Sequence, residues 1–442
     1  MSTVTPAGGP APGAARAGAP ITCVAAGRVV TCDPARATAG DPLGVIERGA
    51  VAFANGHLLA VGPEAELRAT FADGAWQSFP DAVVTPGLVD AHTHAAWVGS
   101  RDREYALRMA GGDYEAIAKA GGGIVASMRA IRETDADSIA AELRARLARM
   151  ARMGVTTVEV KSGYGLDEDG ELKQLGAIDS VRRDSDGDGG GDSTLPPGSA
   201  RSLPRIVATF LGLHALPPEA NGDRDTYARR VTERLLPQVA ERRLATFADA
   251  YVDRSAFSVA QARPFLEQAR ALGLGVRIHA GQFADVGAAE LAADMAAASA
   301  DHLENVRAPG ITRLAEAGVR AVLLPVASFT LKQDPPPIAA LRAAGIPLVV
   351  ASDANPGTAP TESLPLAMAL AVRMYGLTVA EALLGATREA AASLGLGTMT
   401  GTLRPGLAAD LVVWTHPHEN AILQPWGVPR TLSVWRDGAP LF

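Results

Sequence analysis

The chain has 442 residues, 48% of them hydrophobic, 20% charged and 5% aromatic, and this composition excludes the disordered and fibrous classes of protein. The formal net charge is −7 without any basic block, and no apolar run approaches the ~18 residues of a membrane span. The N-terminus also lacks the pattern of a secretory signal, so we expect a cytoplasmic protein that binds neither nucleic acid nor membranes.

Both ends of the chain carry short segments of β character. Residues 1–20 contain 14 Ala, Gly and Pro residues and predict a flexible tail. Residues 21–85 alternate apolar segments with Gly, Asn and Pro breaks, and residues 399–442 repeat this pattern. The two segments predict one small β domain assembled from both termini. Cys23 and Cys32 are expected to be small hydrophobic residues rather than a disulfide framework.

The middle of the chain, residues 86–398, alternates short apolar runs with helical segments. Stretches such as residues 138–154 and 259–273 are rich in Ala, Leu and Arg at a helical period. About eight β units alternate with helices, which predicts a parallel sheet and most simply an α/β fold of the (β/α)₈ barrel type. A doubly wound open sheet is the alternative. The predicted strands are Leu88–Ala91, Val155–Val160, Ile206–Leu213, Thr246–Val252, Val276–Ile278, Ala298–Ala300, Arg320–Leu324 and Pro347–Ala351.

Residues 184–200 interrupt the alternation with a polar stretch rich in Gly and Pro, which predicts a loop insertion in the barrel. The stretch begins DSDGDG, as an EF-hand calcium loop does. Such a loop requires a bidentate glutamate at its twelfth position, where this chain has Leu195. We therefore reject a calcium site.

Five histidine and aspartate positions follow or close predicted strands. His92 and His94 are two residues apart after the first strand, so both imidazoles point to the same side and can reach one metal ion. His279, His302 and Asp353 each close a later strand. In a barrel these ends converge on the C-terminal mouth, where such enzymes place their active sites. Imidazoles and a carboxylate with room for water predict a catalytic metal site.

The segments PGLVDAHTH, REYALRMAGGDYEAIAKAGGGI, EVKSGYGLD, IHAGQFAD, SADHLE and SDANPGT resemble the amidohydrolase superfamily, and within it the imidazolonepropionase family. The resemblance extends from about Ile21 to the C-terminus. It implies a barrel joined to a small β-sandwich formed by both termini, and a homodimer. The chain departs from the family in its N-terminal tail, in the insertion, and at Leu213, where we associate Ala with the family.

The resemblance implies that His92, His94, His279 and Asp353 bind the metal. Asp353 also takes a proton from the attacking water, whose pKa a metal ion lowers. His302 lies beside the water or the substrate carbonyl as an electrostatic partner. The fourth strand contains no lysine that could bridge two ions, so one metal is expected, and this donor set suits Zn²⁺ and Fe³⁺ alike.

The resemblance also places seven residues at a small-molecule substrate. The Arg101 guanidinium suits a carboxylate, and the Gln282 amide replaces a glutamate of related deaminases and cannot shuttle protons. The seven residues are Arg101, Tyr164, His214, Gln282, Asn355, Gly357 and Thr358.

The resemblance implies a metal-dependent hydrolase that opens the ring of 4-imidazolone-5-propanoate with water to give N-formimidoyl-L-glutamate in histidine degradation. A deaminase of a heterocyclic amidine on the same scaffold is the alternative, against which Gln282 and Arg101 argue. A non-catalytic binding protein would be expected to have lost ligands, whereas the candidate set here is complete.

Overall fold

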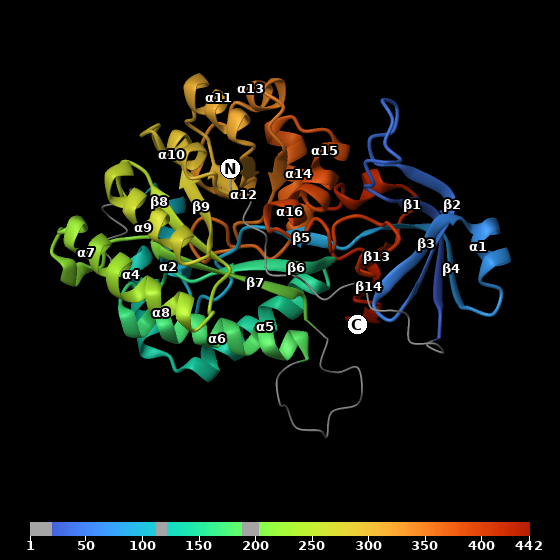
Figure 1. Ribbon diagram of the computed structural model, residues 1–442, viewed down its shortest axis with the longest axis horizontal. Coiled ribbons are helices and arrows are strands. Elements are labelled where there is room, and N and C mark those ends of the chain that lie inside the picture. The colour runs from blue at the N-terminus through green and yellow to red at the C-terminus, as the bar shows by residue number, and fades with distance from the viewer. Residues whose placement is uncertain (1–19, 112–121, 188–202) are drawn as a thin grey trace.

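The computed structural model describes residues 20–111, 122–187 and 203–442. It contains an eight-stranded parallel sheet surrounded by helices and a seven-stranded mixed sheet to one side (Figure 1). Nearly all of the predicted N-terminal tail, and residues 188–200 of the predicted insertion, lie outside the described residues.

All eight predicted barrel strands are present, and each pairs with the next one along the chain. This order confirms the barrel and excludes the doubly wound sheet, in which the strand order would reverse. Buried Val, Ile, Leu and Ala residues dominate these strands. The strands are β5 (Leu88–Asp90), β6 (Val155–Lys161), β7 (Arg205–Leu213), β8 (Phe247–Val252), β9 (Gly275–Ala280), β10 (Ser299–His302), β11 (Arg320–Leu323) and β12 (Leu348–Val350).

Helices follow the strands and bury one face each against the barrel. In α5, for example, Ile139, Leu143 and Leu147 are buried at spacings of four, and the Asp135 side chain caps the first turn by accepting from the Ser138 N–H. The helices around the barrel are α2 (Asp102–Met109), α4 (Ile124–Glu133), α5 (Ala136–Ala151), α6 (Glu168–Asp186), α7 (Arg224–Arg230), α8 (Leu236–Glu241), α9 (Val259–Ala271), α10 (Ala288–Asp294), α11 (Ala308–Ala317), α12 (Pro325–Leu331), α13 (Ile338–Ala343), α14 (Leu364–Tyr375), α15 (Val379–Gly385) and α16 (Arg388–Ser393). Shorter helical turns are η2 (Pro218–Ala220), η3 (Val231–Leu235) and η4 (Glu419–Ile422).

Helix α6 continues further than the sequence predicted. The residues expected to open the insertion loop, Asp184 to Asp186, form its last turn. Their carboxylates are unfavourable at a helix C-terminus, but Arg144 pairs with Asp184, and Arg436 lies 2.9 Å from Asp186. These ion pairs offset the repulsion, so the predicted start of the loop at residue 184 is wrong.

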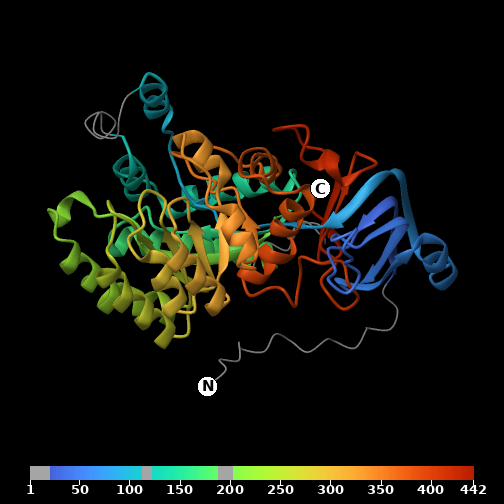
Figure 2. The ribbon, with the colours of Figure 1, turned by 90° about the horizontal axis from the view of Figure 1, so that it is seen from above.

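Strands from both ends of the chain form the second sheet, as predicted. Figure 2 shows its N-terminal strands (blue) beside the C-terminal ones (red). Side chains alternate between two hydrophobic clusters along β1, with Val24 and Ala26 in one and Cys23 and Ala25 in the other. The strands are β1 (Thr22–Val30), β2 (Val45–Ala54), β3 (His57–Pro63), β4 (Ala75–Pro86), β13 (Leu411–Trp414), β14 (Thr431–Arg436) and β15 (Ala439–Pro440), with helix α1 (Glu64–Thr70) after β3.

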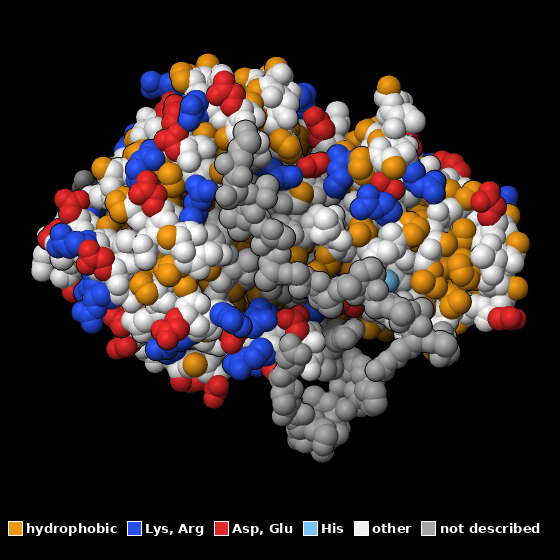
Figure 3. Space-filling model, in the orientation of Figure 1, with side chains coloured by type: hydrophobic (Ala, Val, Ile, Leu, Met, Phe, Trp, Pro, Cys, Tyr) orange, Lys and Arg blue, Asp and Glu red, His pale blue; other side chains and the backbone are white. Residues whose placement is uncertain are grey.

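The surface carries charges of both signs. In the view of Figure 3, basic (blue) and acidic (red) side chains are interspersed over the barrel. None of the helices in the described part of the chain is long and apolar enough to cross a membrane.

Candidate active site

The first and last strands of the barrel meet at the predicted metal site. The Asp353 N–H donates to the His92 carbonyl oxygen, and the His94 N–H donates to that of Ala354, both across 3.0 Å. These bonds close the barrel just beyond the ends of β5 and β12. Asp353 and His302 adopt left-handed backbone angles, with φ of 55° and 81°. Such conformations cost about 1–3 kcal/mol each and gather at functional sites, where the surrounding fold enforces them.

Four imidazoles and one carboxylate converge at this mouth. The Nε2 atoms of His92 and His94 each lie 3.5 Å from Asp353 Oδ1. The His279 ring is centred 4.6 Å from that of His92, and the His302 ring 5.5 Å from that of His279. Potential ligand atoms fall within 4.8 Å of one another in two groups that share His92, namely His92, His94 and Asp353, and His92, His279 and His302. The structure therefore brings all five predicted residues together.

Two of the imidazoles are anchored through one ring nitrogen. His92 Nδ1 lies 2.6 Å from Asp301 Oδ2, and His279 Nδ1 lies 3.1 Å from Asp249 Oδ1. The Nε2 atoms of both rings are buried and have no hydrogen-bond partner among the described residues. Buried polar atoms are rarely left unpaired. A histidine held by a carboxylate at Nδ1, with Nε2 bare, is the arrangement that metal sites use.

A buried ion network, formed by Glu159, Lys161, Asp249, Arg277 and Asp301, lies within the barrel below these ligands. Lys161 Nζ is 2.8 Å from both Glu159 Oε1 and Asp249 Oδ2, and Arg277 Nε is 3.3 Å from Glu159 Oε1. Burial disfavours the charge on Lys161, but the two carboxylates raise its pKa above the ordinary value. The sequence-based predictions did not include this network. Its signal was the polar residue at every second position in VEVK and VRIH, because alternate residues of a strand face the same side.

Burial sets the protonation of the candidate ligands. It lowers the pKa of His92 and of His94 well below the ordinary value, with Lys161 and the neighbouring imidazoles contributing. Both rings are therefore neutral at pH 7 and offer a lone pair to a cation. Burial also raises the pKa of Asp353 to about 7, so a bound cation is needed to keep this group fully ionised at neutral pH.

His302 has an acidic partner of its own. Its Nδ1 lies 3.6 Å from Glu304 Oε1, which also accepts a 2.7 Å hydrogen bond from the Ser328 hydroxyl. Burial disfavours the imidazolium, but the carboxylate of Glu304, together with the charges of Asp353 and Asp301, outweighs burial and raises the pKa of His302. His302 is therefore suited to carry a positive charge at the mouth.

Tyr164 and His214 form one wall of the site. The His214 ring stacks on His94 with 5.3 Å between centroids, and the Tyr164 ring is centred 5.5 Å from that of His214. The Glu171 carboxylate accepts three backbone N–H groups from residues 163–166 and so fixes the loop that carries Tyr164. Burial lowers the pKa of His214 to about 4, so this ring is neutral.

Gln282 lies in the segment that follows β9. The Tyr251 hydroxyl donates to Gln282 Oε1 across 2.7 Å, and the Tyr251 ring is centred 5.6 Å from that of His279. Tyr251 was not predicted as a site residue. Its position two residues after Asp249 on β8 places both side chains on the same side of the strand.

Arg101 is held by Glu104. Its Nε and Nη2 donate to the Glu104 carboxylate across 2.7 and 2.6 Å, and the Gly123 N–H donates to the same carboxylate. A Cβ added to Gly357 would overlap Arg101 Nη1, so glycine is what allows the loop after β12 to approach. The charge of Arg101 lowers the pKa of Tyr164, although burial raises it more. The guanidinium is therefore close to the wall of the site.

The loop after Asp353 is shaped by Asn355. Its Nδ2 donates to the Asp353 carbonyl oxygen across 2.7 Å, and its Oδ1 accepts the N–H groups of Gly357 and Thr358 across 2.8 and 2.7 Å. These bonds give Asn355 a role in shaping the loop, whereas contact of the loop with substrate stays a prediction.

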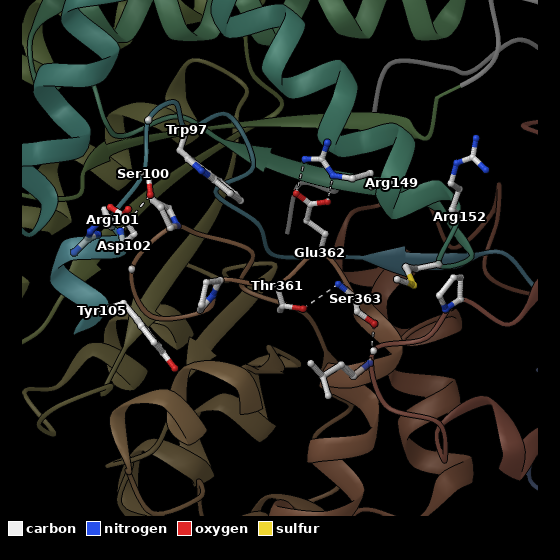
Figure 4. A pocket seen from close by; sticks show the side chains of 18 residues that line it. Trp97, Ser100, Arg101, Asp102, Tyr105, Arg149, Arg152, Thr361, Glu362 and Ser363 are labelled. Carbon is white, nitrogen blue, oxygen red and sulfur yellow. Dashed lines mark hydrogen bonds and ion pairs between the residues drawn. The ribbon is translucent and has the colours of Figure 1, made fainter. Parts of the chain in front are cut away.

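A cavity of about 800 Å³ borders Arg101 (Figure 4). Trp97 and Arg101 come to it from the loop after β5, Tyr105 from α2, Arg149 from α5, and Glu362 from the loop after β12. Arg149 and Glu362 form a bidentate ion pair across 2.6 and 2.8 Å. None of the described residues that line the cavity belongs to the histidine cluster. Arg101 is thus part of the wall of this cavity, and none of the predicted metal ligands is.

Comparisons with known proteins agree with this geometry. The amidohydrolase family model matches residues 203–439, which is more than half of the chain. The imidazolonepropionase of Rhizorhabdus wittichii is 44% identical over 383 residues, covering 85% of this chain and 90% of that protein. The imidazolonepropionase of Geobacillus kaustophilus is 43% identical over 400 residues, covering 90% of each chain. The chain belongs to the imidazolonepropionase family.

The match confirms the resemblance inferred from the motifs. As an amidohydrolase, the chain is a metal-dependent hydrolase of a small molecule, and the histidine and aspartate cluster is placed to bind an ion. A solved structure of an adenosine deaminase from Xanthomonas campestris with bound zinc superposes with a TM-score of 0.65 at 22% identity, covering 95% of this chain and 92% of that one. At this identity the likeness concerns the fold alone.

Proposed function

We propose that the protein opens the ring of 4-imidazolone-5-propanoate with water and releases N-formimidoyl-L-glutamate, a step of histidine degradation. The observation that carries the proposal is the buried cluster in which His92, whose Nε2 atom has no hydrogen-bond partner among the described residues, groups with His94 and Asp353 on one side and with His279 and His302 on the other. The family of the chain supports the choice of substrate. In this reaction the water oxygen bonds to the ring carbonyl carbon, the C–N bond breaks, and the leaving nitrogen takes up a proton.

The residues fit one metal ion, which we propose to be Zn²⁺ or Fe³⁺ held by His92, His94, His279 and Asp353. Three neutral or carboxylate-anchored imidazoles and a carboxylate suit both ions. When bound, the ion supplies Lewis acidity and lowers the pKa of water. We expect one ion rather than two, because the ion pairs of Lys161 with two carboxylates stabilise its ammonium form.

The side chains of the mouth divide the remaining work. Asp353 accepts the proton of the attacking water and passes it to the leaving nitrogen. His302, with Glu304 behind it, stabilises the negative charge that develops on the carbonyl oxygen. Arg101 holds the propanoate, while Tyr164 and His214 pack against the ring.

We further propose a cytoplasmic homodimer in which residues 21–85 and 399–442 form one domain and residues 86–398 the other. Sedimentation velocity over a range of protein concentrations tests the dimer. A mass that stays that of one chain at the highest concentration contradicts it.

The direct test of the function is to incubate metal-loaded protein with 4-imidazolone-5-propanoate. We expect the ring chromophore to disappear while N-formimidoyl-glutamate accumulates in equal amount. His92→Ala should lose bound metal and turnover together, because it removes one ligand of a minimal set. Metal-replete wild-type protein that leaves the substrate intact contradicts the proposed function.

A further inference from the structure

The main chain at Gln282 is fixed by side chains from three other segments. Asn305 Nδ2 and Gln333 Nε2 both donate to the Gln282 carbonyl oxygen across 2.8 Å. The next residue, Phe283, donates its N–H to Asp253 Oδ2, also across 2.8 Å. These partners follow β10, α12 and β8. Because these hydrogen bonds fix the main chain, the contacts of the Gln282 side chain determine how its amide group is oriented.

The Gln282 side chain meets the Tyr251 hydroxyl. Tyr251 on β8 is the register partner of His279 on β9, so its side chain lies next to that of a candidate metal ligand. The hydroxyl donates to Gln282 Oε1 across 2.7 Å, and the Gln282 side chain is buried. An amide has one edge that accepts hydrogen bonds and one that donates them. Because Tyr251 takes the accepting edge, the donating NH₂ edge is the one presented to other groups.

We propose that Tyr251 is a positioning residue that determines specificity by fixing the Gln282 amide with its NH₂ group towards the substrate ring. This inference rests on the proposed function. A ring that carries an oxo group presents an acceptor to this NH₂ group. A ring that carries an amino group at the same carbon places a second donor opposite the Gln282 NH₂ group. A buried donor without an acceptor is unfavourable, so such a ligand binds more weakly. The pair Tyr251–Gln282 therefore selects oxo rings over amino rings, and so separates ring opening from deamination.

The test compares two ligands that differ in the chemistry of this group. They are the lactam 4-imidazolidinone-5-propanoate, which carries the oxo group, and 4-aminoimidazole-5-propanoate, which carries the amino group. Dissociation constants of both are measured by calorimetry on metal-loaded protein, without reference to turnover. The inference thus remains testable if 4-imidazolone-5-propanoate is not turned over, an outcome that would contradict the proposed function by itself.

Wild-type protein should bind the oxo ring more tightly. Tyr251→Phe frees the amide to turn, and should reduce the preference by roughly fivefold to tenfold, the value of one hydrogen bond. Gln282→Glu, which offers only acceptors to the ring, should reverse the preference. Tyr227→Phe is the matched control, because Tyr227 is a buried tyrosine that stacks on Phe257.

A double-mutant cycle separates positioning from a merely structural role. If Tyr251 acts through Gln282, then Tyr251→Phe leaves the preference unchanged in a Gln282→Ala background. Metal content and melting temperature show that each variant is folded. The inference is overturned if Tyr251→Phe weakens both ligands equally, or if it changes the preference as much without Gln282 as with it.

Discussion

The Asp301 carboxylate and His92 Nδ1 lie 2.6 Å apart, which ties the middle of the barrel to the end of its first strand. Asp301 also accepts a hydrogen bond from the Ser299 hydroxyl and lies 3.6 Å from Arg277 Nη2. The carboxylate is thus fixed on both sides before it fixes the imidazole. This bond selects the tautomer of His92 in which Nε2 carries the lone pair, which is the form that binds a cation.

Asp301→Asn should therefore weaken metal binding by roughly 10-fold to 100-fold, since the amide holds the imidazole less firmly. Competition with a chromophoric chelator measures this affinity. Asp294→Asn is the matched control, because Asp294 is an exposed carboxylate on α10 paired with Arg263 and Arg313. Equal metal affinity in both variants would show that the Asp301 bond does not position a ligand.

The fold and the ligand positions could be predicted from the sequence for a common physical reason. Each barrel strand is a short apolar run, and the chain becomes polar where the strand ends at the mouth. His279, His302 and Asp353 stand at these transitions, so hydrophobic periodicity located the strands and the candidate site together.

Hydrophobic periodicity could not predict the buried ion network inside the barrel. Lys161 and Asp249 are 88 residues apart, and their contact depends on which strands are neighbours in the sheet and on their register. A run such as VRIH contributes hydrophobic residues to one side of the strand and polar residues to the other, and a prediction that treats the whole run as apolar does not separate the two sides. The sequence also did not predict the pairing of Arg101 with Glu104, because a guanidinium that suits a substrate carboxylate suits a carboxylate of the protein equally well.

Metal uptake should release a proton from Asp353. In the metal-free protein burial raises the pKa of this carboxyl group to about 7, so it is protonated below that pH and must ionise to bind a cation. His92 and His94 are already neutral and release none. Zinc affinity should therefore rise about tenfold per pH unit up to pH 7 and level off above it.

Calorimetric titration with zinc in buffers of different ionisation enthalpy counts these protons. Asp353→Asn should abolish the release at pH 6, and it should lower kcat by roughly 10²-fold or more because the amide cannot accept a proton. A zinc affinity that does not change between pH 5.5 and 7 would contradict the assignment.

Gly357 gives Arg101 the space that it occupies. In Gly357→Ala the new methyl group displaces a guanidinium that Glu104 holds in place, so KM should rise by roughly 10-fold to 100-fold while metal content is unchanged. Gly176→Ala on α6 is the control, since an added Cβ there meets no atom within 4 Å. If the two variants have the same KM, the position of Arg101 does not matter to the substrate.

The proposal that Arg101 binds the substrate carboxylate is best tested by changing Arg101 together with Glu104. Arg101→Met alone would also remove one partner of the buried ion pair between Arg101 and Glu104, so a loss of activity could come from this ion pair as well as from the substrate. The double variant Arg101→Met/Glu104→Gln removes both charges and keeps both shapes. It should retain metal and fold, and its kcat/KM for 4-imidazolone-5-propanoate should fall by roughly 10²-fold, because the propanoate loses its charged partner.

The defect should shrink for a ring analogue without the propanoate, which wild-type protein should turn over poorly. Equal defects on the two substrates would mean that Arg101 acts on the ring or on the fold of the mouth, and that another group recognises the carboxylate.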